Sequence, residues 1–216
     1  MRSSTKKPAQ RQHTGRRQRT GSEASDRRIG AESSATRALL LDAAERLLLE
    51  EGYASVTSRR VAAAAGVKPA LVHYYFRTMD DLFIAVHRRR AEQNLDRYAR
   101  LLASDQPLRT LWEICIDAGG TAFTMEFVAL ANHRKAIRGE IAEYAERFRR
   151  MQLDALTRAL RAAGLRADAC PPMVALLAMM GLSQVLVLEK ALGFTTGHAE
   201  THAFVERLLG QLETTG

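Results

Sequence analysis

The sequence predicts an all-α protein of about nine helices. Apolar residues recur at spacings of three and four along most of the chain, as Leu40, Ala44, Leu47 and Leu48 do, which gives a helix one apolar face. No segment shows the alternation of apolar and polar residues that is typical of a strand. The chain has 216 residues, of which 46% are hydrophobic. It is therefore long enough for a small domain followed by a larger domain with its own core.

Capping and breaking residues set the expected bounds of the helices. Gly66 suits a tight turn, and Pro69 fits the first turn of a following helix, where its missing N–H costs nothing. Gly119-Gly120 is expected to break a helix, and Gly164 and Gly193 are expected to end the two helices before them. The expected helices are 36–51, 59–65, 69–76, 79–103, 107–117, 121–132, 135–163, 172–192 and 197–213.

Residues 1–33 form an expected basic arm. They are rich in Arg, Ser, Thr, Gly and Gln and hold almost no apolar residues. Such a segment cannot bury enough surface to offset the entropy of the chain, so we expect it to be disordered in free solution. It is either a solvated tail or an arm that follows DNA phosphates.

Positive charge is concentrated in the N-terminal half. The net charge is +8, but residues 101–216 hold twelve Lys and Arg against thirteen Asp and Glu. This polarity is typical of a protein that meets a polyanion at one end. Arg88-Arg89-Arg90 is interpreted either as a solvated face or as added positive field near DNA.

Residues 57–76 form a helix-turn-helix pattern. Thr57 and Ser58 can cap a first helix, Gly66 makes the turn, and a short second helix from Pro69 carries His73 and Tyr74. In such a motif the second helix lies in the major groove of DNA while the first crosses the backbone.

This segment resembles the DNA-binding domain of TetR-family transcriptional repressors. The match begins in the helix 36–51, which ends in Glu-Glu-Gly-Tyr (50–53). It continues through Val56-Thr57, Ala65-Gly66-Val67 and Tyr75-Phe76, and it closes at Asp80-Asp81-Leu82. The resemblance implies a DNA-binding domain at 34–82, and a ligand-binding and dimerisation domain at 83–216.

DNA-contact roles follow from this resemblance by position. Lys68, Pro69 and Ala70 fall where the family reads bases, and Lys68 is able to donate to guanine. Thr57 and Ser58 are expected to bind phosphate at a helix N-terminus. The full expected set is Thr57, Ser58, Arg59, Lys68, Pro69, Ala70, His73, Tyr74 and Arg77.

Two positions depart from the family pattern. The family usually has Lys at the position of Met79, where it contacts a phosphate, and often has Tyr at the position of His73. Met79 cannot make a charge-assisted bond to phosphate. Either Arg77 or the basic arm supplies the charge, or the domain binds the DNA backbone more weakly.

The helix 172–192 is apolar almost all the way round. It is interpreted either as a central core helix or as one that packs in the core on one face and against a second copy on another. Repressors of the resembling family dimerise through their last two long helices. We therefore expect a homodimer through 172–192 and 197–213, and a pseudo-palindromic double-stranded DNA operator.

The resemblance also implies a cavity for a small-molecule inducer among the middle helices. Large apolar side chains with a few polar ones suit a mostly apolar ligand held by one or two hydrogen bonds. Residue by residue, core packing remains the alternative. The expected lining is Trp112, Ile116, Phe123, Phe127, Leu130, His133, Tyr144, Phe148, Met180 and Gln184.

Other classes of function have little support in the sequence. No catalytic triad, metal cluster or phosphate-binding glycine loop is present, so we expect no enzyme, no cofactor and no metal site. His198 and His202 share a helix face without a third ligand. Cys115 and Cys170 are the only cysteines, which fits a reducing cytoplasm, and no membrane span is expected. The leading hypothesis is a ligand-released repressor, and the alternative is a DNA-binding protein without a small-molecule inducer.

Overall fold

The structure is a computed structural model that describes the backbone of residues 19–214 and the side chains of residues 34–213. In this part of the chain every regular element is helical, which confirms the predicted all-α fold. The elements are α1 (Arg19–Glu51), η1 (Tyr53–Ser55), α2 (Ser58–Ala64), α3 (Pro69–Tyr75), α4 (Met79–Leu101), α5 (Pro107–Cys115), α6 (Ala118–His133), α7 (Lys135–Ala162), α8 (Pro172–Ala191) and α9 (His198–Thr214).

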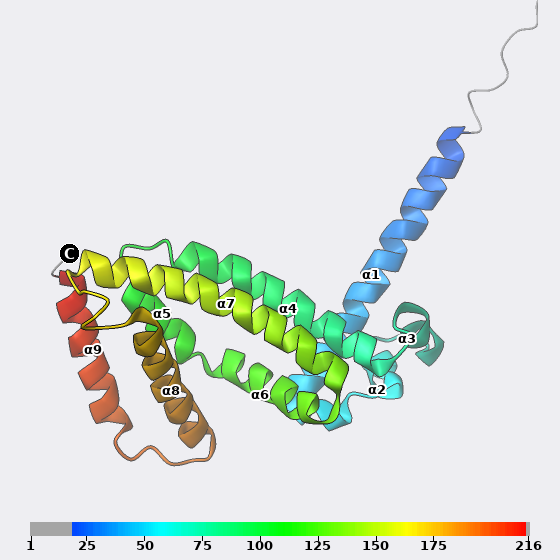
Figure 1. The fold of residues 1–216 in the computed structure, drawn as a ribbon. Coiled ribbons are helices and arrows are strands. Elements are labelled where there is room, and N and C mark those ends of the chain that lie inside the picture. Colours follow the sequence, from blue (N-terminus) through cyan, green and yellow to red (C-terminus); the bar gives the residue numbers. More distant parts are fainter. Residues whose placement is uncertain (1–18, 215–216) are drawn as a thin grey trace, which may run out of the picture.

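The helices form an elongated molecule with two different ends (Figure 1). The long helices α4 and α7 run side by side along its length and pack on each other. The short helices α2 and α3 lie at one end, and α8 and α9 lie at the other. The first part of α1 extends away from the body.

Two predicted boundaries differ from the structure. Helix α1 begins at Arg19, well before the expected start near residue 36, and residues 1–18 of the predicted arm lie outside the described residues. Gly119-Gly120 does not break a helix but lies in the first turn of α6. The carboxylate of Asp117 accepts a hydrogen bond from the Gly119 N–H at 3.1 Å, which caps α6 and moves the break to the residues before it.

The first hydrophobic core joins α1, α2 and α3 to the start of α4. Leu40, Val61 and Leu82 are fully buried in it. Helix α6 also contributes, because Phe127 lies edge-on to Phe83 of α4 with ring centroids 6.5 Å apart. The predicted division at residue 82 is therefore not a packing boundary, since α4 and α6 belong to the same core as the helix-turn-helix.

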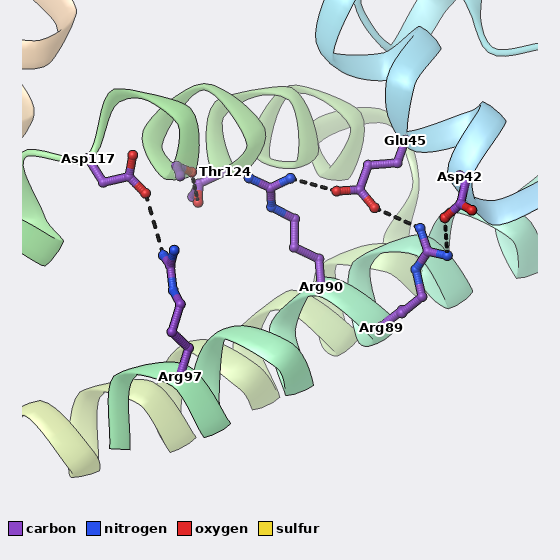
Figure 2. Close-up of polar contacts among 8 residues, drawn as sticks. Asp42, Glu45, Arg89, Arg90, Arg97, Asp117 and Thr124 are labelled. Carbon is purple, nitrogen blue, oxygen red and sulfur yellow. Dashed lines mark hydrogen bonds and ion pairs between the residues drawn. The ribbon is translucent and has the colours of Figure 1, made fainter. Parts of the chain in front are cut away.

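A polar network lies beside this core (Figure 2). Arg89 of α4 binds Asp42 and Glu45 of α1 at 2.7 and 2.9 Å, and Arg90 binds the other oxygen of Glu45 at 2.6 Å. The guanidinium of Arg90 also lies over the Phe123 ring of α6, 4.5 Å from its centroid. Both arginines are half-buried, so neither sequence interpretation of this run describes them: they are neither a solvated face nor free charge for DNA.

The second core lies between α5, α7, α8 and α9. Leu111, Trp112 and Leu176 are buried at its centre, with Leu209 of α9 beside them. The interpretation of α8 as a core helix buried all round is wrong for this chain, because only one face of α8 is covered. Helix α8 has the length and apolar character that a membrane span needs, and only 17% of its most apolar window is buried.

Candidate nucleic-acid interface

The turn between α2 and α3 follows from a few local contacts. The Thr57 hydroxyl accepts from the Arg60 N–H at 3.3 Å and caps α2. Gly66 has a φ of +68°, which lets the chain reverse after α2, and the Val67 N–H then donates to the Ala62 carbonyl at 2.9 Å. Pro69 opens α3 in the first turn, as the sequence predicts.

Buried side chains hold α3 against the rest of the motif. Val72 and Phe76 are almost completely buried and face Val61 and Ala62 of α2 in the first core. The guanidinium of Arg37, from α1, lies 5.3 Å from the centre of the Phe76 ring. The opposite face of α3 is therefore left on the surface by the packing of its apolar face.

The predicted DNA contacts lie on this exposed surface. Tyr74 is the clearest case, with 75% of its area exposed. Within residues 34–213 the charged groups of Arg59, Lys68 and Arg77 have no ion-pair partner, whereas neighbouring Arg60 pairs with Glu51 at 2.6 Å. Of the nine predicted residues, Thr57, Arg59, Lys68, Pro69, Ala70, His73, Tyr74 and Arg77 are exposed and Ser58 is half-buried.

The turn that leads into the motif has a support that the sequence analysis missed. The Glu126 carboxylate of α6 accepts a hydrogen bond from the Tyr53 N–H at 2.8 Å. Gly52, with a φ of +79°, brings the backbone within reach of this carboxylate. No sequence signal links residues 73 positions apart, so only the packing of α6 reveals the contact.

The end of the motif is also tied to distant residues. The Thr78 hydroxyl and the Asp81 carboxylate each accept a backbone N–H of the other residue, which forms a capping box at the start of α4. Asp80 forms an ion pair with Arg134, at the junction of α6 and α7. Met79, between Thr78 and Asp80 in the sequence, is half-buried and packs against the first core.

The predicted ligand-lining residues do not form one group. Phe123, Phe127 and Leu130 are buried in the first core, whereas Trp112, Ile116 and Met180 belong to the second. Tyr144 donates to Glu92 at 2.6 Å, and Phe148 packs on Tyr98. The two other polar residues of the set, His133 and Gln184, are exposed.

His198 has a partner that accounts for its position. Its Nε2 lies 2.8 Å from a carboxylate oxygen of Glu189, and His202 lies against the ring of Trp112. The part of the chain that the structure describes contains no group of three or more His, Cys, Asp or Glu side chains placed to hold a metal ion.

Comparison with known proteins identifies this arrangement. Residues 40–86 match the family described as bacterial regulatory proteins, tetR family. This part of the chain is therefore a TetR-family domain, which supports a TetR-family transcriptional regulator. The match covers the last part of α1, all of α2 and α3, and the start of α4, which is the helix-turn-helix with its supporting helices.

Relatives of the TetR-family domain extend the comparison. Over 52 residues the chain is 44% identical to the HTH-type transcriptional regulator BetI of Rhizobium meliloti (strain 1021). This match covers 24% of this chain and 26% of that protein. The chain spans less than half of the length of the curated relatives that it matches.

Two solved structures share the overall fold. A TetR transcription regulator from Haloarcula marismortui superposes with a TM-score of 0.64 at 20% identity, over 84% of this chain and 97% of that one. The transcriptional regulator FadR from Bacillus subtilis in complex with stearoyl-CoA gives a TM-score of 0.55 at 16% identity, over 83% and 98%. At these identities the likeness shows the fold.

Lys68→Ala and Tyr74→Phe are expected to change DNA binding in different ways. Lys68→Ala removes a donor at the N-terminal end of α3, so it should relax base preference at one position by about 1–3 kcal/mol. Tyr74→Phe removes one hydroxyl that is expected to contact a phosphate, so it should weaken binding to all duplexes by a similar factor of about 2–10. Binding of both variants to a panel of single-base operator variants measures the difference. A uniform loss for Lys68→Ala would contradict its base-reading role.

Met79→Lys is expected to strengthen binding to the DNA backbone. The added ammonium is expected to contact a DNA phosphate that Met79 cannot bind. The slope of log K against log salt should therefore steepen by about one. Met79→Gln is the matched control, because it removes the same apolar packing without adding charge. Equal salt slopes for the two variants would show that no phosphate lies within reach of this position.

Proposed function

We propose that this protein is a dimeric, sequence-specific transcriptional regulator that represses its target genes and leaves its operator when a small, mostly apolar ligand binds. The observation that carries the DNA-binding part is the exposed face of α3. Lys68 precedes this helix and Arg77 follows it, and neither has an ion-pair partner within residues 34–213. The family match over residues 40–86 supports the same conclusion. A regulator of this kind works in the cytoplasm, where it has access to DNA.

The exposed apolar face of α8 and α9 supports dimerisation. Contiguous apolar surface of this kind on a helical domain marks an interaction site, and a second copy of the chain would cover it. A two-fold dimer would present two α3 helices to a pseudo-palindromic operator. The exposed residues of this face are Met173, Val174, Leu177, Leu182, Val185, Leu188, Leu192, Phe194, Phe204 and Leu208.

Ligand control is supported by the way the two cores are connected. Helix α4 carries residues of the helix-turn-helix core at its start and reaches the second core at its end, where Leu102 is buried. A ligand that shifts α6 or α7 therefore displaces α4 and with it α3. To cause release, the ligand must bind the DNA-incompetent arrangement more tightly. The proposal of a mostly apolar ligand is supported by FadR from Bacillus subtilis, a protein of similar fold whose structure was solved in complex with stearoyl-CoA.

The alternative, a DNA-binding protein without a small-molecule inducer, is favoured by one observation. His133 and Gln184, two of the polar residues expected to hold a ligand, are exposed in this structure. Under this alternative the protein is either controlled by a protein partner or acts as an architectural DNA-binding protein.

Selection of bound duplexes from a random pool, with purified protein at near-physiological salt, tests the DNA-binding function. The expected result is a motif with two-fold symmetry and half-sites about one helical turn apart, because a two-fold dimer places its two α3 helices in successive major grooves. Enrichment without a motif would favour the architectural alternative.

Val185→Glu is expected to break the dimer, because a carboxylate buried at an interface without a partner is strongly unfavourable. The dimer dissociation constant should rise at least about tenfold, and operator affinity should fall with it. Val128→Glu on α6 is the matched control, since Val128 is 49% exposed and Val185 is 50% exposed. Sedimentation over a range of concentrations measures both variants. If Val185→Glu stays dimeric, another surface forms the interface.

A further inference from the structure

Gln152 of α7 is a buried amide with an unused acceptor. Its side chain is 1% exposed, and its Oε1 is shielded from solvent and has no hydrogen-bond partner among residues 34–213. Its Nε2 donates only to the Sγ of Cys115, at 3.9 Å, which is a weak contact. A buried acceptor without a partner is unfavourable and is rare in folded proteins, so this amide marks a position where a donor is missing.

Polar groups from three helices meet at this point. Cys115 lies on α5, Gln152 on α7 and Ser183 on α8. Ser183 is buried, and its hydroxyl donates to the Met180 carbonyl at 2.9 Å. Burial raises the pKa of the Cys115 thiol to about 11, a rise that the nearby Ser183 hydroxyl partly opposes. The thiol is therefore neutral and remains an S–H at physiological pH.

The surroundings of these three side chains are apolar. Residues one turn away on the same helix lie on the same face, and each of the three positions has such neighbours in the second core. Methionines among them have flexible side chains that can move to admit a bound group. These neighbours are Leu111, Trp112, Ala155, Leu156, Met179, Met180 and Leu186.

We infer that Gln152, Cys115 and Ser183 are the polar anchor of a ligand site between α5, α7 and α8, and that the ligand is a neutral, mostly apolar molecule whose hydroxyl or amide N–H donates to Oε1 of Gln152. This inference rests on the proposed function for its regulatory meaning, because it names the chemical class of the effector. It replaces exposed Gln184 as the hydrogen-bonding residue of the site.

The chemistry of the anchor selects the ligand class. The three side chains carry no charge, so an anionic or cationic group placed among them would lose its hydration without gaining a counter-ion. The unmatched group, Oε1 of Gln152, is an acceptor, so a ligand that donates a hydrogen bond is expected to bind more tightly. A site with a few polar groups in an apolar wall distinguishes such a ligand from an analogue that lacks the donor.

The site also lies where a ligand can affect both functional surfaces. Ser183 and Leu186 face the core from α8, while Val185 and Leu188 are on its exposed side. A ligand that moves α8 therefore changes the surface proposed for the second copy. Gln152 lies on α7, which packs along α4 towards the helix-turn-helix (Figure 1).

The test compares octanol with its isomer heptyl methyl ether, which has the same atoms but no hydroxyl to donate. Binding to the full-length protein without DNA is measured by calorimetry and by the shift in melting temperature. Octanol is expected to bind about tenfold more tightly than the ether, which is the effect of one buried hydrogen bond. Equal affinities, or no binding of either molecule up to its solubility, would overturn the inference.

Gln152→Met is the decisive variant, because it keeps the volume and removes the amide. This variant should bind octanol and the ether with about equal affinity. Its melting temperature should stay the same or rise, because the unmatched acceptor is gone. Gln93→Met, at an exposed position of α4, is the matched control and should keep the full preference. A preference that persists in Gln152→Met would overturn the role of the amide.

A crystal structure of the octanol complex separates a ligand from a buried water. The expected result is the octanol hydroxyl bonded to Gln152, and a water that keeps this position in the presence of octanol would overturn the inference. The wild-type comparison of the two isomers does not depend on any variant folding. Loss of DNA binding would defeat the proposed function and leave these binding results unchanged, so the two failures are distinguishable.

Discussion

The burial of the first turns of α4 is the constraint on which the rest of the structure depends. Leu82, Phe83 and Val86 are nearly inaccessible to solvent, and they contact the helix-turn-helix on one side and α6 on the other. A close-packed core does not deform gradually, so the position of α3 is fixed relative to α6 and α7 through α4. The ion pairs of Arg89 and Arg90 with Glu45 lie beside this core and reinforce the same connection. The start of α4 therefore belongs to the same core as the helix-turn-helix and α6.

The two exposed surfaces of the molecule have opposite chemistry. Within residues 34–213 the surface of α3 combines cations that have no ion-pair partner with polar side chains, whereas α8 exposes six large apolar side chains and α9 adds Phe204 and Leu208. The first suits a hydrated polyanion, since its groups stay solvated until they meet phosphate. Exposure of the second surface to water is unfavourable, and the free energy falls when another apolar surface covers it. The two surfaces lie at opposite ends of α4 and α7 (Figure 1).

Local signals account for what could be predicted. Thr57, Gly66 and Pro69 determine their turn through backbone hydrogen bonds and φ values within a few residues, and the structure has the turn where the sequence predicts it. The same kind of signal misplaced the break at Gly119-Gly120, because the cap supplied by Asp117 outweighs the low helix propensity of glycine in a first turn. Within the run Arg88-Arg89-Arg90, the half-buried Arg89 and Arg90 differ from both interpretations for another reason. A charge run shows no sign of its partners when Asp42, Glu45 and Glu140 lie more than forty residues away.

The sequence by itself determined the helical fold, the helix-turn-helix and the residues of its exposed face, because helix periodicity, caps and turns are short-range properties of the chain. Only the tertiary structure decided which polar groups are buried. Gln152 and Gln184 are the same residue type in similar apolar contexts, yet one is inaccessible with an unmatched oxygen and the other is on the surface. The difference arises from how α5, α7 and α8 pack, which depends on contacts between segments far apart in the chain. A ligand site is built from such contacts, so its residues could not be chosen from the helix pattern alone.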